Sequence, residues 1–346
     1  MPYDPNYAEL VWASREIFQP RVVDQFFKSN PIARMLRKRV KMHSGGRKIV
    51  FGSLYGAEEA QFLGSKWDPI TAAYKEEYGA AEVDPKVLVR PVIMNLVDVI
   101  VNGPGREQTM DMLKLRSIAA SRAMSNTFGN SLFALDYTIS GSGLAVGAFD
   151  SLDRSVNDAT GSGDETGYSA KTYGGITRAA SGDGATWNAV VDDSTPNITP
   201  DTVNRNFLKA SEGDEQPTMY ASNNKAYSIL WNQLTSIQRE AAENLTGMAG
   251  FQALLLNGKP WVVDSHVPSA DRSVPVSPWG TAPATEYVYG FNMNHIEMHG
   301  YEGAFFSFQE IAAPHDKLLV LGRYLTVGNV VNTSPRLHFK MTGAAG

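Results

Sequence analysis

The sequence contains no cysteine among its 346 residues. This absence excludes a disulfide-stapled scaffold, a catalytic thiol and a metal site built on thiolates. The six histidines are scattered along the chain, and no segment has the spacing of a phosphate-binding loop or a nucleophile motif. The sequence therefore predicts a protein that is not an enzyme, with no catalytic residue, no cofactor and no metal site.

The chain also lacks a long apolar run. Its most apolar stretch, residues 87–101, is interrupted by Arg90, Pro91, Asn95 and Asp98. The stretch is shorter than the roughly 20 residues that a membrane-spanning helix needs. The N-terminus has none of the basic-then-apolar order of a signal peptide. We therefore expect a soluble protein.

What is present is enough apolar and aromatic material for folded cores. Hydrophobic residues make up 43% of the chain and aromatic residues 10%. A chain of this composition buries enough surface to offset its conformational entropy. At roughly 150 residues per domain, its length predicts about two domains.

Charge is distributed unevenly along the chain, whose formal net charge is −5. Residues 1–48 hold ten basic and four acidic side chains, a net charge of +6, so the remaining residues carry −11. We refer to this N-terminal segment as the arm. Within it, Arg34, Arg37 and Arg39 belong to a basic stretch without any acidic residue. Such a stretch can touch nucleic acid, lie on the acidic face of a neighbouring subunit or remain solvated. The alternatives stay open, and the three arginines are candidate contacts between subunits.

A loop with large apolar side chains follows the arm. Residues 48–55 alternate as a strand does, and residues 74–83 are its expected return partner. The connection between them carries Phe62, Leu63 and Trp67. The loop either folds back onto its own core or buries these side chains in another chain, because aromatic anchors dominate interfaces. Phe62, Leu63 and Trp67 are therefore candidate intersubunit contacts.

A long strand and a long helix are predicted next. Residues 87–101 are rich in β-branched side chains, and Pro91 fits an edge strand or a bulge. The apolar period then changes, which predicts a helix from residue 106 to about residue 135. At 1.5 Å per residue this helix is roughly 45 Å long, the length of a spine rather than of a small domain. Its predicted apolar stripe consists of Leu113, Ala120, Met124, Phe128 and Leu132.

The middle of the chain mixes irregular and helical signals. Residues 140–195 are rich in Gly, Ser, Thr and Asp and predict irregular structure or short strands. Thr199 is expected to cap a helix that begins at Pro200. After a short strand at residues 217–221, Ser222 is expected to cap a second helix with Tyr227, Leu230, Trp231 and Leu234 on its apolar stripe.

The remaining pattern is mostly that of strands. The Asn257-Gly258 pair predicts a hairpin turn within residues 254–264, because both positions of that turn require positive φ angles. From residue 286 onward strands are favoured, and the last two are expected at residues 317–331 and 337–341.

One histidine-containing segment superficially resembles a zinc-binding helix. A zinc helix of this kind needs Glu directly after the first His, whereas here Glu297 lies two positions after His295. Strand alternation instead places His295, Glu297 and His299 on one face, with Ile296 and Met298 on the other. We therefore expect a solvent-facing strand edge rather than a metal site.

The order of these features resembles that of a known family. An arm, a two-stranded loop, a long strand, a spine helix and a compact lobe follow one another as in the major capsid proteins of tailed bacteriophages, which have the Hong Kong 97-type fold. The sequence is also similar to that family locally, in residues 87–135, 173–178 with Trp187, 199–234, 251–268 and 317–342. The Gly- and Ser-rich stretch at residues 150–186 is a departure, since it is longer than the family pattern.

The resemblance implies an α+β protein of four parts. These are an N-terminal arm (1–47), an extended two-stranded loop (48–84), a peripheral domain with the spine helix and long strands (85–139 and 316–346), and an axial α/β domain (140–315). It also implies that the arm and the loop overlap neighbouring copies.

The implied function is that of a capsid protein. By this resemblance it is expected to assemble into hexamers and pentamers of an icosahedral shell that encloses double-stranded DNA without sequence-specific binding. Scaffolding, portal and decoration proteins are its expected partners, no membrane is involved, and the virion, assembled in the host cytoplasm, is its location. The alternatives are an encapsulin-like compartment and an unrelated β-rich hydrolase or binding protein.

Overall fold

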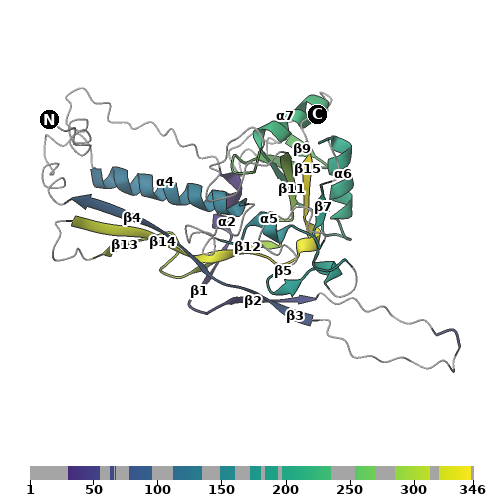
Figure 1. The fold of residues 1–346 in the computed structure, drawn as a ribbon, viewed down its shortest axis with the longest axis horizontal. Helices are drawn as coiled ribbons and strands as arrows, with labels where there is room; N and C mark the ends of the chain where they lie inside the picture. The colour runs from purple at the N-terminus through teal and green to yellow at the C-terminus, as the bar shows by residue number, and fades with distance from the viewer. Residues whose placement is uncertain are drawn as a thin grey trace. The chain divides into compact units, whose positions relative to one another are not determined.

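The computed structural model describes residues 30–54, 63–65, 67, 78–95, 112–134, 149–159, 172–180, 184–193, 197–234, 254–269, 285–311 and 319–343. Its helices are α2 (Pro31–Lys38), α4 (Met112–Leu132), α5 (Leu152–Ser155), α6 (Pro200–Lys209) and α7 (Asn224–Gln233), with 3-10 turns at Ala185–Trp187 and Pro335–Leu337. The strands are β1 (Val40–His43), β2 (Ile49–Leu54), β3 (Tyr78–Val83), β4 (Lys86–Asn95), β5 (Thr172–Tyr173), β6 (Ile176–Thr177), β7 (Val190–Asp192), β8 (Met219–Ser222), β9 (Leu254–Leu256), β10 (Lys259–Val263), β11 (Glu286–Phe291), β12 (Ile296–Tyr301), β13 (Ser307–Ile311), β14 (Leu319–Asn332) and β15 (Phe339–Gly343) (Figure 1).

The chain divides into two compact units. The smaller unit consists of Met1–Lys28, Val87–Thr127 and Gly303–Val327. The larger unit consists of Ser29–Lys86, Phe128–Glu302 and Gly328–Gly346. The four-part division expected from the sequence stays a prediction.

The larger unit is built around a six-stranded mixed sheet with the strand order β7-β15-β11-β8-β10-β9. One face packs against α6 and α7, whose buried residues join the core of that face. Aromatic rings from three of the strands, β8, β10 and β15, line this face. Trp261 of β10 stacks on Tyr220 of β8, and Tyr220 packs against Phe339 of β15, with ring centroids 5.1 and 6.0 Å apart. Gly290 of β11 lies between Tyr220 and Phe339 in the register, so this ladder of rings closes over a residue without a side chain.

The opposite face of the sheet is held by a buried ion pair. Lys340 of β15 lies 3.1 Å from the carboxylate of Asp153 in α5, and the Tyr289 hydroxyl of β11 donates to the same carboxylate at 2.8 Å. The Lys340 and Asp153 side chains are almost fully buried. Separating the two side chains would leave each charge buried without its partner, which is costly. The pair therefore holds α5 against the sheet.

In the smaller unit, α4 covers β4 and β14. The Arg116 side chain of α4 donates to the Ile93 carbonyl of β4 at 2.7 Å, and Ser117 is hydrogen-bonded to the Tyr324 hydroxyl of β14. Val92 of β4 is buried, as its alternation within the strand requires. Strand β13 pairs with β14 antiparallel, and β4 pairs with β14 as well.

Most of the elements predicted from periodicity are confirmed within the described residues. Strands β2 and β3 pair antiparallel, from Ile49 opposite Val83 to Leu54 opposite Tyr78. The predicted helix stripe is buried at Ala120, Met124, Phe128 and Leu132. The predicted extensions of the long strand to residues 96–101 and of the helix to residues 106–111 lie outside the described residues.

Two local predictions are wrong. Asn223, not Ser222, caps α7, because the Asn223 side chain accepts from the Ala226 backbone N–H at 2.8 Å. Ser222 ends strand β8, and its hydroxyl accepts from the Trp261 indole N–H at 2.7 Å. The stripe of α7 is also incomplete, since Leu230 and Leu234 are buried but Trp231 is exposed.

The second correction concerns the histidine-containing strand. The predicted alternation is confirmed, because Ile296 and Met298 of β12 are buried. However, β12 is not a solvent-facing edge. It lies between β1, which pairs with it in parallel, and the end of β14, and His299 is buried.

Candidate intersubunit surfaces

Five of the six residues predicted as intersubunit contacts lie within the described residues. Arg34 and Arg37 lie on α2, Arg39 is its C-cap, and Leu63 and Trp67 lie between β2 and β3. Phe62 lies outside the described residues. The structure places the three arginines at one short helix, and their role as intersubunit contacts stays a prediction.

Helix α2 begins where the sequence supplies a cap and a proline. Asn30 is the N-cap and accepts from the Ala33 backbone N–H at 3.0 Å, and Pro31 occupies the first helical position. Gly129 of α4 leaves room for this cap, because a Cβ there would lie 1.9 Å from the Asn30 amide nitrogen. The stretch predicted as an arm therefore contains a helix, whose start is signalled in the sequence by the Asn30-Pro31 pair.

The apolar face of α2 anchors it to the larger unit. Ile32 and Leu36 are fully buried. The backbone N–H of Ile32 also approaches a carboxylate oxygen of Asp264, the residue that follows β10, at 3.5 Å. A buried carboxylate near a helix N-terminus is favoured by the helix dipole. The segment is therefore a docked helix rather than a free tail.

The opposite side of α2 is cationic. Arg34, Arg37 and Lys38 are exposed there, and we refer to these three residues as the basic face of α2. Arg37 and Lys38 lie in the last turn, where positive charge is favoured by the helix dipole. A cluster of this sign on a protein with a net charge of −5 is a place where an acidic surface can bind.

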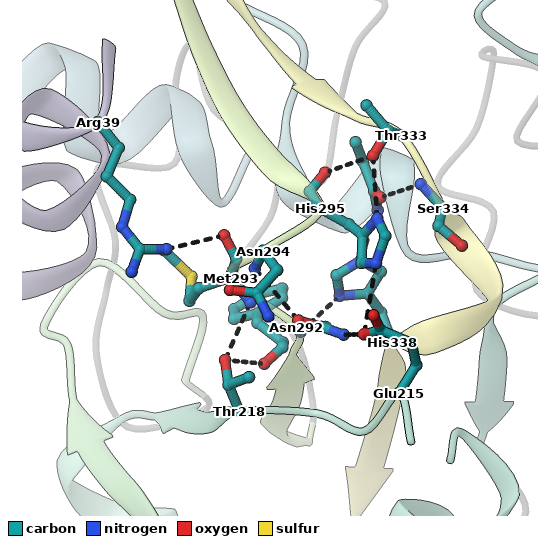
Figure 2. Close-up of polar contacts among 12 residues, drawn as sticks. Arg39, Glu215, Thr218, Asn292, Met293, Asn294, His295, Thr333, Ser334 and His338 are labelled. Atoms are coloured by element: carbon teal, nitrogen blue, oxygen red, sulfur yellow. Dashed lines mark hydrogen bonds and ion pairs between the residues drawn. The ribbon is translucent and has the colours of Figure 1, made fainter. Parts of the chain in front are cut away.

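Arg39 differs from the other two arginines. Figure 2 shows its guanidinium directed toward the turn between β11 and β12, where it donates to the Met293 carbonyl at 3.1 Å. This bond ties the end of α2 to the turn within one chain. The predicted intersubunit role of Arg39 stays a prediction, and at least one of its donors is engaged internally.

The turn that receives Arg39 is held by several side-chain hydrogen bonds. The Asn292 side chain donates to Glu215 at 2.8 Å, and the Asn292 backbone N–H donates to Nδ1 of His338 at 3.0 Å (Figure 2). Nε2 of His338 in turn lies 3.0 Å from the Asn332 side-chain oxygen. Since Nδ1 accepts, Nε2 must carry the proton of a neutral imidazole. The chain of bonds links the turn to the segment between β14 and β15.

Burial governs the protonation of His338. Its removal from water, together with the nearby charge of His295, lowers the pKa of His338 to about 3. His295 itself lies 3.5 Å from Glu215 and bonds to Thr333 (Figure 2). A histidine that stays neutral near pH 7 and uses both nitrogens in the fold serves as a structural anchor rather than as a general base.

The loop between β2 and β3 presents apolar side chains to solvent. Trp67 is 91% exposed and Leu63 is 46% exposed. The Trp67 backbone N–H donates to the hydroxyl of Ser65 at 3.4 Å, a contact within the loop. An indole with this exposure is unusual in a monomer and is typical of an interface anchor. Leu63 and Trp67 are thus exposed in the single chain, and their role as intersubunit contacts stays a prediction.

Sequence reasoning missed a second exposed apolar surface. Val87, Val89 and Ile93 lie on one face of β4 and are exposed, whereas Val92 and Met94 on the other face are buried. The sequence contained a signal for this surface, because residues 87–94 carry apolar side chains at odd-numbered and at even-numbered positions, which lie on opposite faces of a strand. A strand that is apolar on both faces is expected to be covered on both.

No group of three or more His, Cys, Asp or Glu residues that could hold a metal ion occurs in the described part of the chain. The helices within the same ranges include none with the length and hydropathy needed to span a bilayer.

Comparison with known proteins gives a likeness of fold. No family model matches the sequence, and no curated protein matches it. Among solved structures, the Cyanophage A-1(L) capsid asymmetric unit matches with a TM-score of 0.67 at 12% identity, over 95% of this chain and 96% of that chain. The capsid of the native GTA particle matches with a TM-score of 0.54 at 11% identity, over 95% and 96% of the two chains.

The holo-SrpI encapsulin complex of Synechococcus elongatus PCC 7942 matches with a TM-score of 0.56 at 8% identity, over 99% of this chain and 96% of that chain. At these identities the likeness establishes fold and not activity. The match to a phage capsid chain confirms, at the level of fold, the resemblance identified from the sequence. The chain therefore has the mixed α+β fold that these capsid and encapsulin chains share.

Proposed function

We propose that the protein is the major capsid protein of a tailed bacteriophage. In this proposal it assembles into the hexamers and pentamers of an icosahedral shell around double-stranded DNA and has no catalytic role. The observation that carries the proposal is the match to the Cyanophage A-1(L) capsid asymmetric unit over nearly the full length of both chains. The match covers 95% of this chain, so it does not rest on one shared motif.

The exposed apolar and cationic surfaces fit this function. A closed shell repeats a few heterologous contacts many times, so each contact can be modest while the whole assembly is stable. Trp67, Leu63 and the exposed face of β4 supply apolar area, and the basic face of α2 supplies charge. We assign the arm (1–47) and the loop (48–84) to overlap with neighbouring copies, around a peripheral domain (85–139 and 316–346) and an axial domain (140–315).

The charge balance fits a wall that encloses DNA without gripping it. Outside residues 1–48 the chain carries a net charge of −11. Strong cation–phosphate contacts would bind DNA with a steep salt dependence and resist its rearrangement during packing. Scaffolding, portal and decoration proteins are the further partners in this proposal, and the virion, assembled in the host cytoplasm, is the location.

The test is the state of the purified full-length protein. We expect light scattering and negative-stain electron microscopy to show closed particles or capsomers of many copies. A stable monomer of about 38 kDa that does not assemble at high concentration, with or without a co-expressed scaffolding protein, would contradict the proposal.

An encapsulin-like compartment is the second candidate, favoured by the match to the SrpI encapsulin complex over 99% of this chain. The contents of particles purified from the producing cells separate the two candidates. Nuclease-protected double-stranded DNA of uniform length supports the phage capsid, whereas a packaged enzyme detected by native mass spectrometry supports the compartment.

A further inference from the structure

Two histidines face each other across the pairing of β1 with β12. Nε2 of His43 lies 2.8 Å from Nδ1 of His299, and the two rings are within 7° of parallel, with centroids 5.0 Å apart. With this centroid separation, so short an N···N distance requires the rings to lie edge to edge in nearly one plane. The lone pair of one nitrogen therefore points at the other nitrogen, which is the geometry of a hydrogen bond and leaves no space for a metal ion between them.

A carboxylate determines which nitrogen carries the proton. Glu297 of β12 lies 3.2 Å from Nε2 of His299 and 2.7 Å from the Lys41 ammonium of β1. Burial raises the pKa of Glu297, but its contacts with Lys41 and His299 lower the pKa further, so the net shift is downward. An ionised Glu297 accepts the Nε2 proton of His299, which leaves Nδ1 of His299 bare. His43 must then be the donor of the bond between the rings.

This arrangement responds to protons in two unequal steps. A proton added to Nδ1 of His43 leaves its Nε2–H donor in place. A proton added to His299 must go to Nδ1, and two N–H groups would then face each other at 2.8 Å. Burial lowers the pKa of His299, and although Glu297 raises it, the net pKa lies below the ordinary value of 6.5. The second step therefore breaks the bond.

We propose that the His43–His299 pair is a pH-sensitive latch, which holds β1 on β12 at neutral pH and weakens that attachment in mild acid. The bond requires a neutral His299, and a depressed pKa means that its contribution is fully present above the unfolded-state value of about 6.5. The contribution is lost as the pH falls through the lower value of the folded state.

The charged surroundings support this direction. Lys41 of β1 opposes a second positive charge at the pair, whereas the basic face of the neighbouring α2 lies on the exposed side of that helix. Glu297 is the carboxylate in contact with the pair, and it is already bonded to Lys41. On β12 the Tyr301 ring lies near His43, and on β14 Asn329 opposite His299 is bonded to the carboxylate of Asp150.

Release would be local to β1 and its connection to β2. The carbonyl of His43 accepts from the Glu302 backbone N–H at 3.0 Å, and the Tyr301 hydroxyl donates to the Gly46 carbonyl at 2.8 Å. Helix α2 has its own anchors in Ile32 and Leu36, which contain no titrating group. The latch therefore controls how the segment between α2 and β2 is held, independently of whether the assembly proposal is correct.

Hydrogen–deuterium exchange of the full-length protein tests the latch. The amide protection of residues 40–43 is measured at about pH 7.5 and about pH 5, corrected for the intrinsic exchange rate. We expect the protection to fall in acid by about tenfold for each pH unit by which the pKa of His299 lies below its ordinary value. His299→Gln should remove most of this pH dependence, because a glutamine oxygen accepts from His43 and does not titrate in this range.

Matched variants separate the latch from general acid destabilisation. His295→Gln alters a histidine that bonds Thr333 instead of His43 and should retain the wild-type pH dependence. If His299→Gln fails to fold, His43→Gln serves instead, since its amide can turn to donate or to accept. The same pH dependence of residues 40–43 in the wild type and in the folded glutamine variant would overturn the proposal, and so would protection that does not change with pH in the wild type.

Discussion

The ring of Phe339 in β15 lies directly over Gly290 of β11, so that a Cβ at position 290 would stand 2.0 Å from Cε1 of the ring. The two residues are register partners in the six-stranded sheet. The absence of a side chain at 290 is what allows the aromatic ladder to close across β8, β11 and β15.

We therefore predict that Gly290→Ala destabilises the larger unit by about 2 kcal/mol or more, because a methyl group cannot fit without moving a fully buried ring. The measurement is the urea midpoint of the unassembled protein. Gly52→Ala is the matched control, since it also lies in a strand and a Cβ there meets nothing within 4 Å. Equal midpoints for the two variants would contradict the packing argument.

The buried ion pair gives a second prediction. Lys340→Met leaves the Asp153 carboxylate inside the larger unit without its cation, and we expect a loss of about 3 kcal/mol in the free energy of unfolding. Adding Asp153→Asn removes the second charge and should restore part of that loss. Lys48→Met, which breaks an exposed pair with Glu82, should change stability little. A double variant no more stable than Lys340→Met would show that the cost does not come from an uncompensated charge.

Short-range features of the fold could be predicted because their causes lie within a few residues. Asn257 and Gly258 both have positive φ angles, as the predicted hairpin turn requires. Thr199 caps α6 in a reciprocal arrangement with Thr202. In both cases the residues that favour the backbone conformation lie within a few positions of one another.

Features that depend on distant pairing could not be predicted. The pattern of residues 295–299 gave the faces of β12 correctly, but nothing near them indicates that β1, more than 250 residues earlier, lies alongside. The choice between Ser222 and Asn223 as helix cap likewise depends on Trp261, which binds the Ser222 hydroxyl.

The candidate surfaces divide in the same way. Trp67 could be identified from the sequence as an aromatic residue in a loop. The exposed face of β4 could not, because it depends on which face of the strand α4 covers.

The neutral His338 gives a third prediction, on acid stability. Because its pKa is lowered to about 3 in the folded protein, its contribution is present above the unfolded value of about 6.5 and is lost as the pH falls below it. At about 1.4 kcal/mol per unit, the loss reaches about 2 kcal/mol near pH 5. Urea titrations of the wild type and of His338→Gln at about pH 7.5 and about pH 5 check this. The free energy of unfolding of the variant should fall less between the two pH values than that of the wild type. Parallel losses in both proteins would show that His338 does not contribute.

The last prediction concerns Trp67, whose side chain is 91% exposed in the single chain. If it is an anchor for a neighbouring copy, Trp67→Ala should leave the melting temperature of the unassembled protein unchanged, because the side chain packs against little of its own chain. The same variant should lower the yield of particles at least tenfold, since a buried aromatic anchor contributes about 2 kcal/mol or more at each interface and a shell repeats that interface. Trp67→Phe keeps an apolar ring and should retain most of the yield.

Particle counts from electron microscopy and light scattering at matched concentrations provide the measurement. Normal assembly by the alanine variant would remove Trp67 from the interface, whereas a fall in its melting temperature would mean that the loop folds against its own chain.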